Sequence, residues 1–143
     1  MQHRVLSAGV VIAHGQPAGR RYLLLRAYQY WDFPKGMVEQ GEQPLDAAIR
    51  EVEEETTLND LHFAWGHDYF ETGPYNRGKV ARYYIAETET DEVSLPINPE
   101  LGRPEHDEFR WLQYDDAYTI LPARVKPVIQ WASRIIESGS MHS

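Results

Sequence analysis

The sequence predicts an α/β protein in which a mixed β-sheet is covered by helices. Short apolar segments typical of buried strands occur at 5–13, 21–28 and 79–88. A helix follows the second of these segments, and apolar residues at helical spacing close the chain. Elements in this order pack as a sheet with helices on its faces.

The length and composition fit one globular domain. The chain has 143 residues, of which 42% are hydrophobic and 12% aromatic, and this is about the size of a single domain. We therefore expect one domain over residues 1–143. The tail from about residue 138 is small and polar, so we expect it to fray.

Composition also excludes several classes of protein. The sequence contains no cysteine, which excludes disulfides and thiol catalysis. It has no apolar run of membrane-spanning length, and 5–13 is read as a strand instead of a signal peptide. We expect a cytoplasmic protein without a membrane partner, either a monomer or a homodimer. A net charge of −8 argues against a general nucleic-acid-binding surface, but a small phosphate-rich molecule can bind an acidic site through a metal.

The first half of the chain leads into a helix. A turn containing Gly and Pro joins the first two strands over 14–20. Residues 33–36 are expected to form a tight turn that continues as a glycine-punctuated loop to Glu42. Pro44 suits the first position of the helix, because its fixed φ is already helical and it lacks an N–H that would be unsatisfied there.

The second half is expected to alternate strands and loops before the last helix. Apolar residues recur at helical spacing from Val125 to Ile136, and Pro127 fits only the first turn, so this helix begins close to Arg124. The other expected segments are a strand at 61–70, a loop at 72–78, a strand at 79–88, an irregular excursion at 90–105, a strand at 109–112 and a helical turn near 115–120.

The helix that begins at Pro44 carries an unusual concentration of carboxylates. Glu51, Glu54 and Glu55 share one face, beside a face of apolar residues. Like charges weaken an isolated helix, and a bound cation would explain them. Oxygen ligands without Cys or His favour Mg²⁺, with Mn²⁺ as a substitute, over Zn²⁺. For this segment alone, a solvated surface face is the simpler interpretation. The apolar positions are Leu45, Ala48, Ile49 and Val52.

The spacing before and within this helix resembles the Nudix box. The box reads Gly, five residues, Glu, seven residues, Arg-Glu-aliphatic, one residue, Glu-Glu, one residue, Gly, aliphatic. The resemblance implies an α/β/α sandwich and a pyrophosphohydrolase. One position departs, since Thr57 replaces the second Gly, which often ends a helix in the left-handed conformation. Threonine tolerates that conformation poorly, so we expect a different helix exit. The matching residues are Gly36, Glu42, Arg50, Glu51, Val52, Glu54, Glu55 and Leu58.

The resemblance also implies roles for the box residues. It places Glu51, Glu54 and Glu55 near the metal, and it makes Arg50 an orienting partner and Glu42 a further carboxylate of the box. The residues themselves support the role of Arg50, because its guanidinium can pair with Glu54 one turn on. Backbone atoms of glycine-bounded loops approach ligands closely, so Gly36 joins the candidate metal ligands. Which Glu accepts the proton of water stays open.

Two segments outside the box resemble the asymmetric diadenosine tetraphosphate hydrolases, a Nudix subgroup. The Glu-His…Arg-Trp-Leu segment at 105–112 implies that Glu105 is a metal ligand or general base, and the residues at 31–36 resemble the subgroup's Trp-x-x-Pro-Lys-Gly segment. Taken alone, Glu105 would be solvated and His106 a surface or structural histidine. Lys79 resembles the subgroup's phosphate-binding lysine, but the aromatic residue expected seven positions earlier is Thr72.

Candidate substrate-binding residues follow from charge and aromatic character. Lys35, Arg77 and Lys79 are cations that would offset repulsion between a polyphosphate and an acidic protein. Tyrosines near loops offer stacking platforms for nucleobases, worth about 1–3 kcal/mol per base, although a core role is equally compatible with each of them. The tyrosines selected are Tyr28, Tyr75 and Tyr118.

The leading hypothesis is a Mg²⁺-dependent hydrolase of dinucleoside polyphosphates that converts diadenosine tetraphosphate to ATP and AMP. Its catalytic candidates are Arg50, Glu51, Glu54 and Glu105. Within the same chemistry, the alternative substrates are 5′-triphosphorylated RNA and other nucleoside or inositol polyphosphates. Outside enzymes, the alternative is a nucleotide-sensing Nudix-like binding module. The complete set of box carboxylates argues against this alternative.

Overall fold

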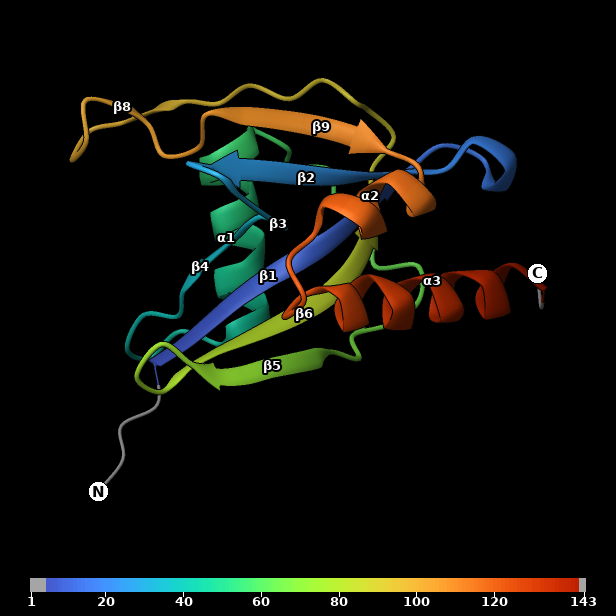
Figure 1. Cartoon of the computed structure of the whole chain (residues 1–143), viewed down its shortest axis with the longest axis horizontal. Helices are drawn as coiled ribbons and strands as arrows, with labels where there is room; N and C mark the ends of the chain where they lie inside the picture. The colour runs from blue at the N-terminus through green and yellow to red at the C-terminus, as the bar shows by residue number, and fades with distance from the viewer. Residues whose placement is uncertain (1–4, 142–143) are drawn as a thin grey trace.

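The computed structural model describes residues 5–141 as a mixed β-sheet between helices, as the sequence predicts (Figure 1). Two apolar clusters, one on each face of the sheet, form the core. The elements are β1 (Val5–His14), η1 (Pro17–Gly19), β2 (Arg21–Ala27), β3 (Tyr30–Asp32), β4 (Lys35–Met37), α1 (Pro44–Thr56), β5 (Phe70–Tyr75), β6 (Lys79–Glu87), β7 (Ile97–Asn98), β8 (Arg103–Pro104), β9 (Glu108–Leu112), α2 (Tyr114–Ile120) and α3 (Lys126–Met141).

The sheet is organised around β1. Its path runs β3-β2-β1-β6-β5, with β4 also pairing with β1 and β9 with β2. The pair β1 and β6 is parallel and the other pairs are antiparallel. The edge of β1 that faces away from β6 is shared by two strands. There β4 pairs with residues 7–9 and β2 with residues 13–14. This division places β4 directly beside α1.

The helices cover opposite faces of the sheet. In Figure 1, α1 lies behind β1 and β6, whereas α2 and α3 lie in front of them. Alternate residues of β1 serve the two layers, since Val10 and Ile12 pack on the α1 side and Val11 packs on the α3 side. Because residues 8–13 of β1 are buried on both faces, their sequence is continuously apolar.

Helix α1 begins at Pro44 as predicted, but its buried face is rotated from the predicted one. Ile49, predicted on the apolar face, is 38% exposed. Ala47, Ala48 and Val52 are fully buried, and Glu55 is 94% buried with only 6% exposed. Small alanines let the helix approach the sheet closely on this side, and that contact carries Glu55 inward.

The exit of α1 does not differ as predicted. Thr57 adopts the left-handed conformation at φ 67°, where the box places glycine, and its N–H donates to the carbonyl of Glu53 at 2.9 Å. The next residue, Leu58, is buried in the core. Helix capping and the burial of Leu58 therefore hold Thr57 in a backbone conformation that its branched side chain disfavours.

Two strand predictions are shifted along the chain. The predicted strand at 61–70 is absent over 61–69 apart from one isolated bridge between His62 and Glu87. The strand is β5, which occupies most of the predicted loop at 72–78 and lies at the sheet edge. Likewise, the predicted tight turn at 33–36 includes the start of β4. Within the predicted excursion at 90–105, β7 and β8 form a short hairpin.

The last helix begins close to Arg124 with Pro127 in its first turn, as predicted. It continues to Met141, and the fraying expected from about residue 138 stays a prediction. The rest of the predicted tail, 142–143, lies outside the described residues. No helix in the described chain is long and apolar enough to span a membrane.

Candidate active site

The carboxylates of α1 line a cavity of about 730 Å³ between this helix, β4 and the segment that leads to β9. The fold thus brings the box and the distant Glu105 together, as the sequence predicts for these residues. The lining residues are Gly36, Met37, Glu39, Arg50, Glu51, Glu54, Glu55, Leu95, Pro96, Ile97, Asn98, Pro99, Glu100, Pro104, Glu105 and His106.

Gly36 allows the Glu51 carboxylate to lie against the backbone of β4. A Cβ atom at position 36 would lie 2.0–2.4 Å from the carboxyl atoms of Glu51. No side chain larger than hydrogen fits there unless Glu51 moves. The strand therefore supplies a flat backbone surface on which this carboxylate rests.

Glu55 is a buried carboxylate with one unsatisfied oxygen. Its Oε1 accepts a hydrogen bond from the backbone N–H of Lys35 at 3.3 Å, and its Oε2 has no hydrogen-bond partner. Burial, reinforced by repulsion from Glu105 and Glu51, raises its pKa well above the ordinary value. A buried polar atom without a partner is costly, and a divalent cation at this oxygen would remove that cost.

Arg50 fixes the orientation of the neighbouring carboxylates. Its guanidinium donates to Glu42 at 2.9 and 3.0 Å, to Glu51 at 2.8 Å, to Glu54 at 3.2 Å and to the carbonyl of Met37 at 3.0 Å. The expected ion pair between Arg50 and Glu54 is present, but the bidentate contact of the guanidinium is with Glu42. This contact, with a backbone hydrogen bond from Glu39, lowers the pKa of Glu42 to about 2.

Two opposing effects act on the pKa of Glu51. Its partial burial raises its pKa, whereas the hydrogen bond and the positive charge of Arg50 lower it. Its side chain is far less exposed than that of Glu54, which lies toward solvent. The three carboxylates of one helix face thus differ in depth, with Glu55 deepest and Glu54 outermost.

Glu105 and His106 approach Glu55 from the segment before β9. Candidate ligand atoms of these three residues all lie within 4.8 Å of one another. The His106 side chain is only 14% exposed, so of the two roles that the sequence alone suggests, surface or structural histidine, the surface role does not apply. Burial lowers its pKa, which favours the neutral imidazole. Although α1 has no histidine, the fold brings an imidazole nitrogen close to the Glu55 carboxylate, and the only sequence signal for this is the adjacency of His106 to Glu105.

The wall facing α1 is a proline-rich segment at 95–99 that the sequence indicates only as irregular. Its entry is tied to the end of α1 by a hydrogen bond from the N–H of Ser94 to the carbonyl of Thr56 at 3.2 Å. Ile97 in this wall is 68% exposed. The cavity therefore has an acidic side formed by α1 and an apolar side formed by this segment.

A second polar network lies next to Lys35 and was not predicted. The Lys35 ammonium is 3.7 Å from Asp32, which also accepts a hydrogen bond from Arg124 at 2.6 Å. The hydroxyl of the buried Tyr83 donates to Asp32 at 2.9 Å. Through these contacts Arg124, which lies just before α3, helps to fix the position of the segment from Asp32 to Lys35.

The predicted substrate-binding residues do not line this cavity, and Tyr75 and Tyr118 pack on the α3 side of the sheet. Arg77 and Lys79 lie on the hairpin between β5 and β6, and Tyr75 of the same hairpin packs its ring against Arg124 at 4.2 Å. Tyr28, in the turn after β2, is 73% exposed. Tyr118 stacks on another tyrosine of α2. Of the predicted cations, Lys35 alone contacts a residue of the carboxylate cluster, through its backbone N–H.

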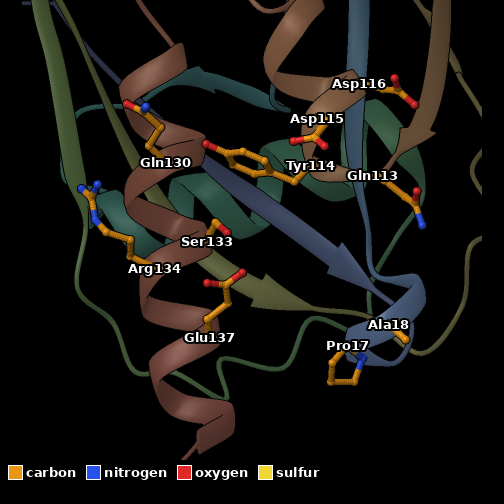
Figure 2. Close-up of a pocket in the computed structure, with 10 residues that line it drawn as sticks. All are labelled: Pro17, Ala18, Gln113, Tyr114, Asp115, Asp116, Gln130, Ser133, Arg134 and Glu137. Atoms are coloured by element: carbon orange, nitrogen blue, oxygen red, sulfur yellow. The ribbon is translucent and has the colours of Figure 1, made fainter.

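A larger cavity of about 820 Å³ lies elsewhere, between η1, the start of α2 and α3 (Figure 2). The Tyr114 ring lies across it, and Ser133 and Glu137 project from α3. Within residues 5–141, the one group of three acidic or histidine side chains positioned to share a metal is that of Glu55, Glu105 and His106. The cavity beside α1 is therefore the candidate active site.

The chain is similar to known proteins in both sequence and fold. The NUDIX domain model matches residues 3–132. An RNA pyrophosphohydrolase of Rhizobium meliloti (strain 1021) is 35% identical, with 80% of this chain and 74% of that protein covered. An asymmetrical bis(5′-nucleosyl)-tetraphosphatase of Caenorhabditis elegans is 32% identical, with 81% and 84% covered. A crystal structure of a C. elegans Ap4A hydrolase binary complex superposes with a TM-score of 0.76 at 26% identity, covering 94% of this chain and 98% of that one.

Proposed function

Because the chain belongs to the Nudix domain family and is a hydrolase of that family, we propose that it hydrolyses a phosphoanhydride bond of dinucleoside polyphosphates, diadenosine tetraphosphate above all. Water adds to one phosphorus, the bond from that phosphorus to a bridging oxygen breaks, and the products are ATP and AMP. The observation that carries the proposal is the buried, unsatisfied carboxylate of Glu55 beside Glu51 and Glu105 in one cavity.

The residues present fit a hard divalent cation, which we take to be Mg²⁺. Glu51, Glu54, Glu55 and Glu105, with the backbone of Gly36, would hold it. When bound, Mg²⁺ neutralises phosphate oxygens and lowers the pKa of a coordinated water. The protein's own contribution is positional, since phosphoryl transfer depends mainly on alignment and charge stabilisation.

Arg50 supplies much of this alignment. Its contacts with Glu42 and with the carbonyl of Met37 fix the guanidinium, and the guanidinium in turn orients Glu51 and Glu54. In a cluster of like charges this single cation also offsets the repulsion that the carboxylates exert on one another. We propose Glu51, Glu54 and Glu105 as the candidates for activating water.

The substrate beyond the reacting phosphates would extend past the cavity walls. Lys35, Arg77 and Lys79 are the proposed phosphate contacts, and Tyr28, Tyr75 and Tyr118 the proposed base contacts. The similarity to the C. elegans Ap4A hydrolase over nearly its whole length supports a dinucleoside substrate. The net charge of −8 disfavours long RNA.

The second candidate substrate is 5′-triphosphorylated RNA, which is supported by the 35% identity to an RNA pyrophosphohydrolase. A direct test compares kcat/KM for diadenosine tetraphosphate and for a triphosphorylated oligonucleotide, with Mg²⁺ in ¹⁸O water. Equal amounts of ATP and AMP, with one product labelled, support the proposal. Preferential turnover of the oligonucleotide favours the second candidate, and no turnover of either favours a binding module.

Matched variants test the assignment of the site. Glu54→Gln should reduce turnover at least about 100-fold, because it removes a charge that positions the reacting groups. Glu53→Gln is the control, since it makes the same change one residue away on the exposed side of α1. Equal activity of the two variants would contradict the metal assignment.

A further inference from the structure

The contact between His106 and Glu55 has an unusual separation. Nδ1 of His106 lies 4.0 Å from Oε1 of Glu55. Hydrogen bonds between nitrogen and oxygen are about 2.7–3.2 Å long, so the two atoms do not share a proton. Two ligands that each lie about 2.0–2.3 Å from one ion are about 3–4.5 Å apart. The 4.0 Å between these two atoms is therefore a distance expected between two ligands of one metal ion.

The surroundings of this gap are those of a metal site. Oε2 of Glu55 is buried and has no hydrogen-bond partner, although the side chain is more than nine-tenths buried. Glu105 brings a third ligand atom, and the ligand atoms of all three residues lie within 4.8 Å of one another. One ligand comes from α1 and two from the segment before β9, so an ion here would join two parts of the chain.

We propose that His106 donates a nitrogen ligand to a divalent metal ion that Glu55 and Glu105 also bind, and that this position prefers a first-row transition metal to Mg²⁺. The inference rests on the metal assignment of the proposed function and refines it. Mg²⁺ prefers oxygen ligands, whereas imidazole binds transition metals more strongly.

The cavity would then contain two kinds of position. Glu51 and Glu54 offer oxygen ligands near solvent and suit Mg²⁺. Glu55, Glu105 and His106 offer two oxygens and one nitrogen in the deeper part and suit Mn²⁺, Co²⁺ or Zn²⁺. A preference of the deeper position for a transition metal would make the enzyme respond to the supply of that metal.

Pulsed electron paramagnetic resonance of bound Mn²⁺ tests the ligand directly, without a measurement of activity. The wild-type protein should show ¹⁴N coupling of a directly coordinated imidazole. Uniform ¹⁵N labelling of histidine should change this to ¹⁵N coupling in an unsubstituted protein, so the test does not depend on whether a variant folds. His106→Gln should lose the coupling, whereas the control His62→Gln, at an exposed histidine paired with Glu87, should keep it.

Metal titrations give a second measurement. His106→Gln should weaken Mn²⁺ binding by at least the roughly 10–100-fold that follows loss of even an outer partner of a metal ligand, and Mg²⁺ binding should change much less. Bound Mn²⁺ without histidine coupling, or coupling that persists in His106→Gln, would overturn the inference and leave the proposed function intact. If the protein bound neither Mn²⁺ nor Mg²⁺, both would be overturned.

Discussion

At the scale of single residues, Gly36 determines how closely β4 and the Glu51 carboxylate approach. Gly36→Ala should lower kcat/KM about 100-fold, because its Cβ would displace a carboxylate whose position matters to within about 1 Å. Stability should change by no more than about 1 kcal/mol, since the displaced atoms are the end of a flexible side chain. Activity assays and urea unfolding measure the two effects separately.

Gly19→Ala is the matched control for this substitution. A Cβ there meets nothing within 4 Å, so both activity and stability should match the wild type. If Gly36→Ala retained full activity, Glu51 would have room to function elsewhere and the role assigned to β4 would be wrong.

Thr57 offers a stabilising substitution. Thr57→Gly should raise the free energy of unfolding by about 1 kcal/mol, because the left-handed conformation at φ 67° costs a residue with Cβ about 1–2 kcal/mol. Thermal unfolding would show a Tm increase of about 4 °C. Thr57→Ala, which keeps Cβ, should recover less of this, and an equal gain in both variants would contradict the backbone explanation.

Single residues were predictable where spacing alone determines position. The turn of 100° per residue places Glu51, Glu54 and Glu55 on neighbouring positions of α1, and they line one cavity. Periodicity does not fix which of them is buried, since that depends on how the alanines of α1 pack against the sheet. His106 was beyond prediction for a related reason, because only tertiary folding brings the segment before β9 to the buried end of α1.

At the scale of elements, the loop after β4 is fastened to α1 by the pair of Glu42 and Arg50. Glu42→Gln should lower Tm at pH 7, because the folded state holds the pKa of Glu42 at about 2 against an ordinary 4.5. A lowered carboxylate pKa stabilises the fold above about pH 4.5, and this stabilisation is lost as the pH falls toward 2. The Tm difference between wild type and variant should therefore shrink between pH 4.5 and pH 2.

Glu39→Gln is the control for this measurement, since Glu39 lies 3.9 Å from the same guanidinium and is exposed. Its Tm difference from the wild type should be small across the whole pH range. A difference for Glu42→Gln that stayed constant down to pH 2 would mean that the carboxylate charge is not what fastens the loop.

Among the elements, β5 shows why a strand was missed. Its sequence, from Phe70 to Tyr75, contains adjacent Gly and Pro, which usually indicate a turn. The strand tolerates them because it lies at the sheet edge and its register with β6 shifts between Thr72 and Tyr75. Strands at the sheet centre, such as β1 and β6, have mostly apolar sequences without proline and were predicted almost to the residue.

At the scale of the whole molecule, metal binding should be linked to global unfolding. At pH 8, Mg²⁺ at 100 times its Kd should raise the free energy of unfolding of the wild type by about 2.7 kcal/mol. Glu55→Gln should be at least as stable as the wild type without metal, because it removes a buried charge repelled by two others. It should gain much less from Mg²⁺ in urea titrations. A full Mg²⁺ effect in this variant would exclude Glu55 as a ligand of the bound Mg²⁺.

The overall architecture was predictable because the order of strands and helices restricts how layers can pack. The sequence did not reveal the shared edge of β1, where β4 and β2 occupy different halves. That arrangement depends on contacts such as the close approach of Gly9 to Pro34, where a Cβ would lie 2.3 Å from a carbonyl oxygen. Such contacts exist only once both segments are folded.

The parallel pairing of β1 with β6 also affects how the newly made protein folds. Val5 pairs with Lys79 and Ala13 with Glu87, so one apolar edge of β1 has no partner until β6 has been synthesised. At about 5–20 residues per second, this delay is about 4–15 s. An apolar, β-branched edge exposed for that time is a site of aggregation. The yield of native protein should therefore fall when translation slows between β1 and β6.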